Sequence, residues 1–483
     1  MSIATLNPER VWKHFYALTQ IPRPSKHEQK AIEFVTKFGK DLGLETHVDE
    51  VGNVIIRKPA TKGMENRKGI ILQGHLDMVP QKNSDKVHDF QKDPIETYID
   101  GDWVKAKGTT LGGDNGIGLA MAMAVLEAND LEHGLIEALF TADEETGMTG
   151  AFGLKSGLLK GDILINLDSE EEGELCVGCA GGLDGTFTFN YKEESVPAGY
   201  EAYKLSVAGL KGGHSGVDIA LGRGNANKIL FRILYALDKE YGARLATIDG
   251  GSLRNAIPRE AFATFAAPAG KAAEIKQRVE KLFKLAAAEL SATDAGLTVT
   301  VEPVAAPATL IDAVAQKNIM LAVYACPNGV IRMSDSLPIV ETSTNLAIVK
   351  SNNGVVTVNC LLRSSVDSAK EDLADMMGAV FTLAGAGVKF SGAYPGWKPN
   401  PSSAILQAMK DTYKKLYGKE PVVSAVHAGL ECGILGGVYP GLDMISCGPT
   451  LRFPHSPDEQ LNIPSVDKCW QFLLETLKNA PVK

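Results

Sequence analysis

Two kinds of apolar pattern alternate over about the first 185 residues. Continuous apolar runs predict buried strands, because a strand covered on both faces carries apolar side chains at successive positions; they lie at 54–56, 70–72, 135–142 and 162–168. Between them, apolar residues recur at helical spacing at 11–18, 32–42 and 119–126. Strands that alternate with helices predict an α/β domain with a largely parallel central sheet.

The pattern changes from about residue 185. The segments 186–190 and 203–207 alternate polar and apolar residues, which is typical of half-exposed strands. A comparable order of helix and strands recurs between 312 and 363, so we expect an inserted α+β domain with two related halves. The first pattern then resumes. The predicted domains are 1–185 with 394–483, interrupted by the insertion 186–393.

Potential metal ligands follow the predicted strands of the first domain. His75 and Asp77 end one strand and, being two residues apart, face the same side. The other candidates are Asp114 in a glycine-rich turn, Glu144 and Glu145, Asp168, and His455 beyond the run 443–447. Because ligand sites in parallel sheets lie beyond the carboxyl ends of the strands, we expect these side chains to meet.

Each motif also has an ordinary structural interpretation. His75 can simply hydrogen-bond its neighbour, Asp114 can cap the helix that follows it, and the acids 143–145 can form an exposed turn. The glycines around Asp114 would let the backbone crowd a bound ion. Placement of every candidate at a strand end favours one shared site.

Two histidines and three carboxylates suit a pair of zinc ions, with cobalt or manganese as substitutes. We expect His75 on one ion and His455 on the other, with Asp114 bridging, and Glu145 and Asp168 completing one ion each. Such an ion pair lowers the pKa of water and polarises a carbonyl group. The predicted reaction is therefore hydrolysis of an amide or peptide bond.

Two acids remain without a metal. Glu144 is then the candidate general base, which takes a proton from the attacking water and passes it to the leaving amine. Asp77 is expected to accept a hydrogen bond from His75 and fix its tautomer.

The inserted domain supplies candidate substrate contacts. His214, in the loop 212–216, would donate to the oxyanion as the domain closes, and Arg363 at a strand end would bind a substrate carboxylate. A surface histidine and an ordinary salt bridge are the alternatives. Asn255, Arg332 and His427 are weaker candidates.

Composition excludes several classes of function. The chain has 49 Lys and Arg against 58 Asp and Glu, a net charge of −9, which disfavours nucleic acid and anionic membranes as partners. It contains no basic segment followed by an apolar core at its start and no run of about 18 apolar residues. The seven cysteines are scattered and odd in number, as in reduced proteins. We therefore expect a cytoplasmic protein.

Five motifs together resemble those of the co-catalytic zinc peptidases, which include carnosinases, carboxypeptidase G and succinyl-diaminopimelate desuccinylase. They are Gly74-His-Leu-Asp77, Gly113-Asp-Asn-Gly116, Glu144-Glu-Thr-Gly147, Asn166-Leu-Asp168 and Pro454-His-Ser-Pro457. Further segments are similar to the bacterial aminoacyl-histidine dipeptidases, and the resemblance spans the chain; these are Asp77-Met-Val-Pro-Gln-Lys82, Leu210-Lys-Gly-Gly-His-Ser-Gly216 and His427-Ala-Gly-Leu-Glu-Cys-Gly433.

The resemblance implies a zinc-peptidase domain with an inserted lid, two zinc ions held by the five ligands named above, and Glu144 as general base. It also implies cleavage of unblocked dipeptides, especially Xaa-His dipeptides such as carnosine. His214 matches the family's oxyanion histidine, Asn255 its lid asparagine and Arg363 a residue after a lid strand. Many relatives form homodimers through the lid. An N-acyl-amino-acid deacylase or tripeptidase, and a non-catalytic binding protein, are the alternatives.

Overall fold

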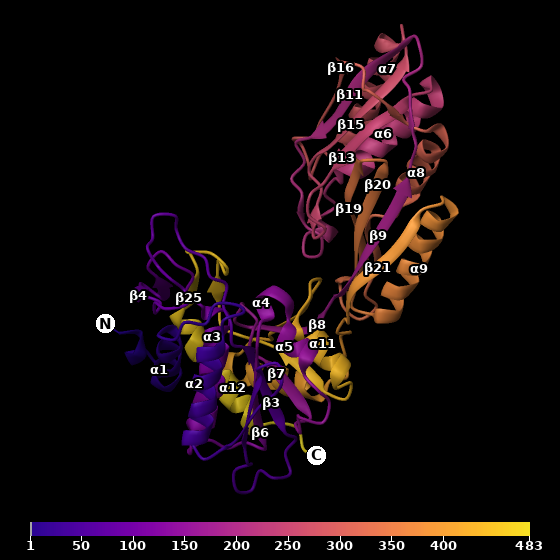
Figure 1. Ribbon diagram of the computed structural model, residues 1–483. Helices are drawn as coiled ribbons and strands as arrows, with labels where there is room; N and C mark the ends of the chain where they lie inside the picture. The colour runs from indigo at the N-terminus through magenta and orange to yellow at the C-terminus, as the bar shows by residue number, and fades with distance from the viewer. Residues whose placement is uncertain (1) are drawn as a thin grey trace. The chain divides into compact units, whose positions relative to one another are not determined.

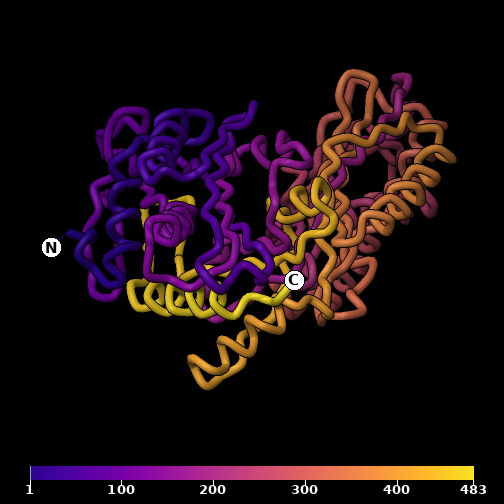
Figure 2. Tube along the Cα trace, turned by 90° about the horizontal axis from the view of Figure 1, so that it is seen from below, coloured from indigo at the N-terminus to yellow at the C-terminus, as the bar shows by residue number. Residues whose placement is uncertain are grey.

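The computed structural model describes residues 2–483, which divide into two compact units (Figure 1). The first unit comprises the chain up to Gly178 with 399–425 and 430–483, and the second comprises 179–398 with 426–429. Both the N-terminal segment and the C-terminal helix belong to the first unit (Figure 2). Among the described residues, no helix is long and apolar enough to cross a membrane.

An eight-stranded sheet forms the centre of the first unit. Its strands, in spatial order, are β1 (Glu45–Val48), β2 (Val54–Lys58), β6 (Ile136–Thr141), β3 (Ile70–His75), β7 (Ile163–Asn166), β23 (Asp443–Ser446), β8 (Glu174–Cys179) and β22 (Val422–Val426). The four strands β6, β3, β7 and β23 pair in parallel, whereas β1, β2 and β8 pair antiparallel. The sheet is thus parallel in its centre, as predicted, and antiparallel beside it.

Helices surround this sheet. They are α1 (Glu9–Thr19), α2 (Gln29–Asp41), α3 (Gly113–Glu127), α4 (Glu144–Gly147), α5 (Thr149–Gly153), α10 (Ala404–Tyr417), α11 (Glu431–Val438) and α12 (Ile463–Lys478), with the 3-10 turn η1 (Ile3–Thr5). Helix α3 is apolar on every side and buried along most of its length, between α1 and β3. A helix without a polar face must lie inside the protein. This burial fixes the start of α3, which carries Asp114.

A small sheet in the same unit holds the segment around His455. Its order is β24 (Leu451–Arg452), β25 (Gln460–Asn462), β5 (Trp103–Ala106) and β4 (Thr97–Asp100). Strands β24 and β25 pair antiparallel, with Leu451 opposite Leu461. The loop that carries His455 therefore starts and ends on paired strands.

The second unit is a nine-stranded sheet with helices on one face (Figure 1). The strands, in spatial order, are β16 (Thr298–Val304), β11 (Tyr200–Ala208), β15 (Ala261–Pro268), β13 (Arg244–Gly250), β19 (Val340–Asn352), β20 (Val355–Ser364), β9 (Gly181–Asn190) and β21 (Gly387–Tyr394), and β18 (Gly329–Met333) pairs with β19. The helices are α6 (Ala226–Tyr241), α7 (Ala272–Glu289), α8 (Ala313–Ala325) and α9 (Asp367–Leu383), and short elements are β10 (Glu193–Glu194), β12 (Gly213–His214), β14 (Ala256–Ile257), β17 (Leu310–Ile311) and η2 (Ile219–Leu221).

The strand order of this sheet reveals an internal duplication. One copy runs β11-α6-β13-β15-α7-β16 and the other β9-α8-β19-β20-α9-β21, so both have the order strand, helix, strand, strand, helix, strand. In the sheet the two copies mirror each other, and β13 and β19 meet where Gly250 pairs with Val349. The sequence predicts two halves in succession, but the first copy is inserted between β9 and α8 of the second.

The long segment of the second unit begins and ends at paired residues. The N–H of Cys179 donates to the carbonyl of Trp397 at 3.0 Å, and the N–H of Trp397 donates back at 2.9 Å. The two ends of this segment therefore lie side by side.

Candidate active site

His75 and Asp77 lie at the carboxyl end of the central strand β3. His75 Nδ1 lies 3.3 Å from Asp77 Oδ1. The Asp77 carboxylate also accepts the backbone N–H groups of Glu144, at 2.9 Å, and Glu145, at 3.2 Å. Burial by itself would raise the pKa of Asp77, but the contact with His75 and the N–H group of Glu144 lower it to about 2. Asp77 thus holds the imidazole and the start of α4 together.

Asp114 lies between the two histidines. Its Oδ1 is 2.9 Å from His75 Nε2 and its Oδ2 is 3.1 Å from His455 Nε2. A second carboxylate approaches each imidazole: Asp168 Oδ1 is 3.4 Å from His75 Nε2, and Glu145 Oε2 is 3.1 Å from His455 Nε2. The five predicted ligands therefore come together as two sets that share Asp114.

This cluster has more acceptors than donors. Glu145 Oε1 and Asp168 Oδ1 are buried, and neither forms a hydrogen bond with any of residues 2–483. Burial raises the pKa of Asp168 to about 6 and that of Glu144 well above its usual range. Hydrogen bonds to Asp114 and Glu145 raise the pKa of His455 to about 11. Unsatisfied buried oxygens are costly, so the cluster favours a bound cation.

The donor set fits divalent metal ions of the zinc type. Ligand atoms of His75, Asp114 and Glu145 all lie within 4.8 Å of one another. Imidazole nitrogens with carboxylate oxygens suit zinc, cobalt and manganese. A metal ion can bind to the imidazole nitrogens and carboxylate oxygens of these short contacts once the imidazoles are deprotonated.

Two structural alternatives from the sequence are wrong. Asp114 does not cap the helix, although its backbone and that of Asn115 are non-helical at this point of α3, because its side chain contacts the two histidines instead of a backbone N–H group. The acids 143–145 do not form an exposed turn, since Glu145 has only 6 % of its side chain exposed.

The glycines around Asp114 leave room for protein side chains. A Cβ on Gly113 would lie 2.6 Å from Leu451 Cδ1.

A second cluster, within the second unit, surrounds Arg363. Its guanidinium lies 3.4 Å from His214 Nε2 and from Ser215 Oγ, and 3.1 Å from the hydroxyl of Tyr394. Arg363 is only 4 % exposed, and within residues 2–483 no carboxylate pairs with it. The predicted residues His214 and Arg363 thus lie together, around a buried cation without an anionic partner.

The remaining predicted residues of this unit differ in their surroundings. His427 Nε2 lies 2.7 Å from Ser343 Oγ, and burial, reinforced by the charge of Arg363, lowers the pKa of His427 to about 4. Asn255 is exposed, and its backbone carbonyl accepts the N–H of Ser215. Arg332 is 61 % exposed and pairs with Glu341 at 3.3 Å, so it stands outside the cluster.

Sequence reasoning missed several residues that contact these clusters. Tyr394 and Ser343 belong to no motif that we recognised. Glu459 lies four residues after His455, and this proximity was its only signal. Arg23 lies between two prolines in a break between helices, which gives no functional indication.

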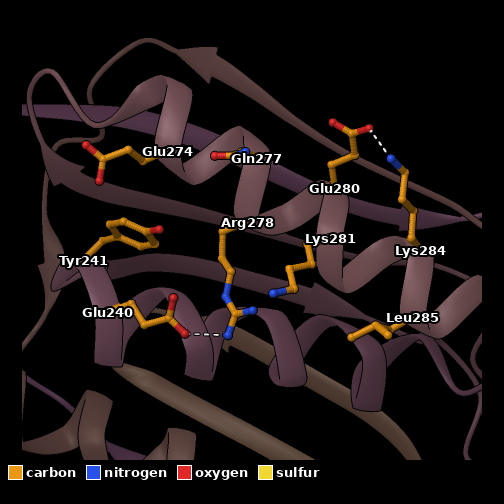
Figure 3. A pocket seen from close by; sticks show the side chains of 9 residues that line it. All are labelled: Glu240, Tyr241, Glu274, Gln277, Arg278, Glu280, Lys281, Lys284 and Leu285. Atoms are coloured by element: carbon orange, nitrogen blue, oxygen red, sulfur yellow. Dashed lines mark hydrogen bonds and ion pairs between the residues drawn. The ribbon is translucent and has the colours of Figure 1, made fainter.

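A groove of about 680 Å³ between α6 and α7 holds none of the predicted residues (Figure 3). Its charges are largely paired with one another: Glu240 with Arg278 at 2.5 Å and Glu280 with Lys284 at 2.9 Å. This groove therefore shows no preference for the charge of a ligand.

Comparison with known proteins identifies the family of the chain. Residues 71–479 match the model of peptidase family M20/M25/M40. The chain is 48% identical over 482 residues to the cytosol non-specific dipeptidase of Escherichia coli (strain K12), covering 100% of this chain and 99% of that protein. The crystal structure of aminoacylhistidine dipeptidase from Vibrio alginolyticus superposes with a TM-score of 0.97 at 48% identity, covering 100% of this chain and 99% of the other. Aminopeptidase PepT from Bacillus cereus, at 18% identity and a TM-score of 0.57 over 98% of this chain and 99% of the other, shares the fold.

Proposed function

Because the chain belongs to peptidase family M20/M25/M40, as the sequence predicts, we propose that it is a metal-dependent dipeptidase that cleaves unblocked dipeptides. The observation that carries the proposal is the position of Asp114, which contacts both histidines while a further carboxylate approaches each of them. This is the donor arrangement that a two-metal hydrolase requires.

The metal site has two halves. His75 and Asp168 would hold one zinc ion and His455 and Glu145 the other, with Asp114 contributing to both; cobalt or manganese are possible substitutes. When bound, such ions lower the pKa of water and polarise the substrate carbonyl. Glu145 Oε1 and Asp168 Oδ1 support this assignment, because both are buried and neither forms a hydrogen bond with any of residues 2–483.

Glu144 acts as the general base. It is anchored through its backbone N–H to Asp77, and among the described residues no hydrogen bond or ion pair of its side chain to a histidine is found. Burial raises its pKa, and a carboxylate with a raised pKa is a better proton acceptor. Glu144 takes the proton of the attacking water and delivers it to the leaving amine, while Asp77 keeps His75 oriented.

The second unit binds the substrate and acts as the lid. Arg363 binds the substrate carboxylate, because its buried guanidinium has only neutral neighbours. His214 donates a hydrogen bond to the oxyanion. Asn255, His427 and Arg332 contact the substrate less directly, and of these Arg332 has the least support, since it is exposed and paired with Glu341.

The names of the relatives guide the choice of substrate and compartment. The Escherichia coli protein is called a cytosol non-specific dipeptidase and the Vibrio protein an aminoacylhistidine dipeptidase. We propose that this chain acts in the cytoplasm on dipeptides, with Xaa-His dipeptides such as carnosine among them. Homodimer formation through the second unit also stays a proposal.

The test compares three substrates with metal-depleted and zinc-restored protein. We expect hydrolysis of carnosine, little or none of a blocked acyl-histidine and of a tripeptide, and activity only after zinc is restored. Preference for the blocked compound would indicate a deacylase, and preference for the tripeptide a tripeptidase. Equal activity of thoroughly chelated protein would overturn the metal site.

A further inference from the structure

The backbone that carries Asp114 is held by the carboxylate of Glu459, which is buried. This carboxylate accepts four consecutive backbone N–H groups: Glu459 Oε2 accepts those of Leu111 at 2.7 Å and Gly112 at 3.1 Å, and Oε1 accepts those of Gly113 at 2.8 Å and Asp114 at 3.3 Å. The loop therefore depends on one side chain that lies about 350 positions away in the sequence.

A buried arginine holds the other side of the same loop. Arg23 is 2 % exposed, and its guanidinium donates to the carbonyl oxygens of Leu76 at 3.0 Å, Asp77 at 2.7 Å and Gly112 at 2.5 Å. These carbonyls belong to the end of the segment that carries His75 and to the loop that carries Asp114. Arg23 thus sets the spacing between two segments that each supply a metal ligand.

The glycines of the loop are required by this close approach. Gly112 has φ = +70°, and a Cβ on it would lie 2.8 Å from Nη2 of Arg23. A Cβ on Gly113 would lie 3.2 Å from Glu459 Oε1. Backbone N–H groups can approach a side-chain carboxylate this closely only where a bulky side chain does not intervene.

We propose that Glu459 is a positioning residue that fixes the Asp114 carboxylate between the two imidazoles, with Arg23 as its counterpart on the side of His75. Glu459 and His455 belong to one loop between β24 and β25, so a single loop supplies one metal ligand and anchors another. The two halves of the metal site are thereby coupled through the backbone. This inference rests on the proposed metal site.

The experiment uses Glu459→Gln in the full-length protein. Glutamine has one carbonyl oxygen, so about half of the four N–H groups lose their acceptor and face an NH2 group instead. Metal-depleted protein is titrated with Zn²⁺ against a chromophoric chelator, and thermal unfolding of the metal-free protein is followed in parallel. We expect zinc affinity about 10- to 100-fold weaker than in the wild type, the range for residues that orient metal ligands.

Glu137→Gln is the matched control. Glu137 is a buried glutamate of the same unit that accepts the N–H groups of Lys160, at 2.7 Å, and Gly161, at 2.6 Å, but it lies at the start of β6, at the opposite end of the strand from Glu144. This substitution should lower the unfolding temperature and leave zinc affinity unchanged.

Three results overturn or support the inference. Wild-type zinc affinity in Glu459→Gln, with or without a lower unfolding temperature, overturns it and leaves the proposed function intact. Absence of zinc binding by the wild type overturns the proposed function and this inference together. Should Glu459→Gln fail to fold, Glu459→Asp keeps the charge but is one methylene shorter; weaker zinc binding in that variant supports the inference, and unchanged binding overturns it.

Discussion

In the described part of the chain, the polar clusters of the two units differ in the charge that they lack: the first lacks a cation and the second lacks an anion. In the first unit, Oε1 of Glu145 is buried without a hydrogen bond to any of residues 2–483, and the buried Oδ1 of Asp168 has only the ion-pair contact with His75 Nε2 at 3.4 Å. In the second unit, the guanidinium of Arg363 is buried among a histidine and two hydroxyl groups, without an acid. Since an unpaired buried polar group is costly, each cluster indicates the charge of what it binds. Under the proposed function, the first cluster would bind metal cations and the second the carboxylate of a dipeptide.

The largest effect should follow from Glu144→Gln. The substitution removes the proton acceptor but none of the five proposed ligands, so we expect kcat to fall about 10²- to 10⁴-fold while zinc content stays at the wild-type level. Stopped-time assays with carnosine and elemental analysis of the same sample measure both quantities. Loss of zinc would show that Glu144 is a ligand, and near-normal turnover would remove it from the mechanism.

Arg363→Met tests whether the second cluster binds the carboxylate of the substrate. Methionine keeps much of the length and removes the charge, so kcat/KM for a dipeptide should fall about 30- to 10³-fold, as expected when one partner of a buried charge pair is lost. A dipeptide amide, which has no terminal carboxylate, should be cleaved equally by variant and wild type. An equal loss on both substrates would assign Arg363 a structural role, and the second cluster would then not be a carboxylate site.

The smallest effect concerns His427 and pH. Its pKa in the folded protein is about 4, below the ordinary value of about 6.5, because burial and the charge of Arg363 oppose protonation. Below pH 6.5 the unfolded chain binds a proton that the folded protein does not, so folding stability falls as the pH drops toward 4. Relative to His427→Gln, the wild type should lose about 2 kcal/mol of unfolding free energy over this range and nothing above pH 7. Urea denaturation at several pH values measures this difference, and parallel curves would contradict it.

The first unit could be predicted well from the sequence because its chemistry follows a local rule. Each of His75, Glu144 and Asp168 comes at or just after a buried apolar strand, and the carboxyl ends of neighbouring parallel strands meet at one edge. The rule that ligands follow buried strands does not identify the residues that hold these ligands in place. Arg23 and Glu459 act through backbone atoms, which have no sequence signature, and their contacts are known only once the chain is folded.

The second unit was harder to predict for two physical reasons. Its strands are antiparallel and brought together by long-range pairing, so the nested order of the two copies is not visible along the chain. Its cluster around Arg363 includes Ser215 and Tyr394, and Ser343 contacts His427. Serine and tyrosine side chains are common in any protein, so they give no signal in the sequence. Arg332 is an example: its guanidinium could bind a carboxylate, but it lies on β18, exposed and outside the cluster around Arg363.

The paired ends of the long segment of the second unit have a consequence for engineering and for evolution. Cys179 and Trp397 hydrogen-bond to each other, so the segment of 217 residues between them begins and ends at neighbouring positions in space. A chain with that geometry can exchange the whole insertion for another, or for a short turn, without stretching the connections of the remainder. Under the proposed function, such an exchange would change the substrate preference and keep the residues of the first unit that are proposed to carry out hydrolysis.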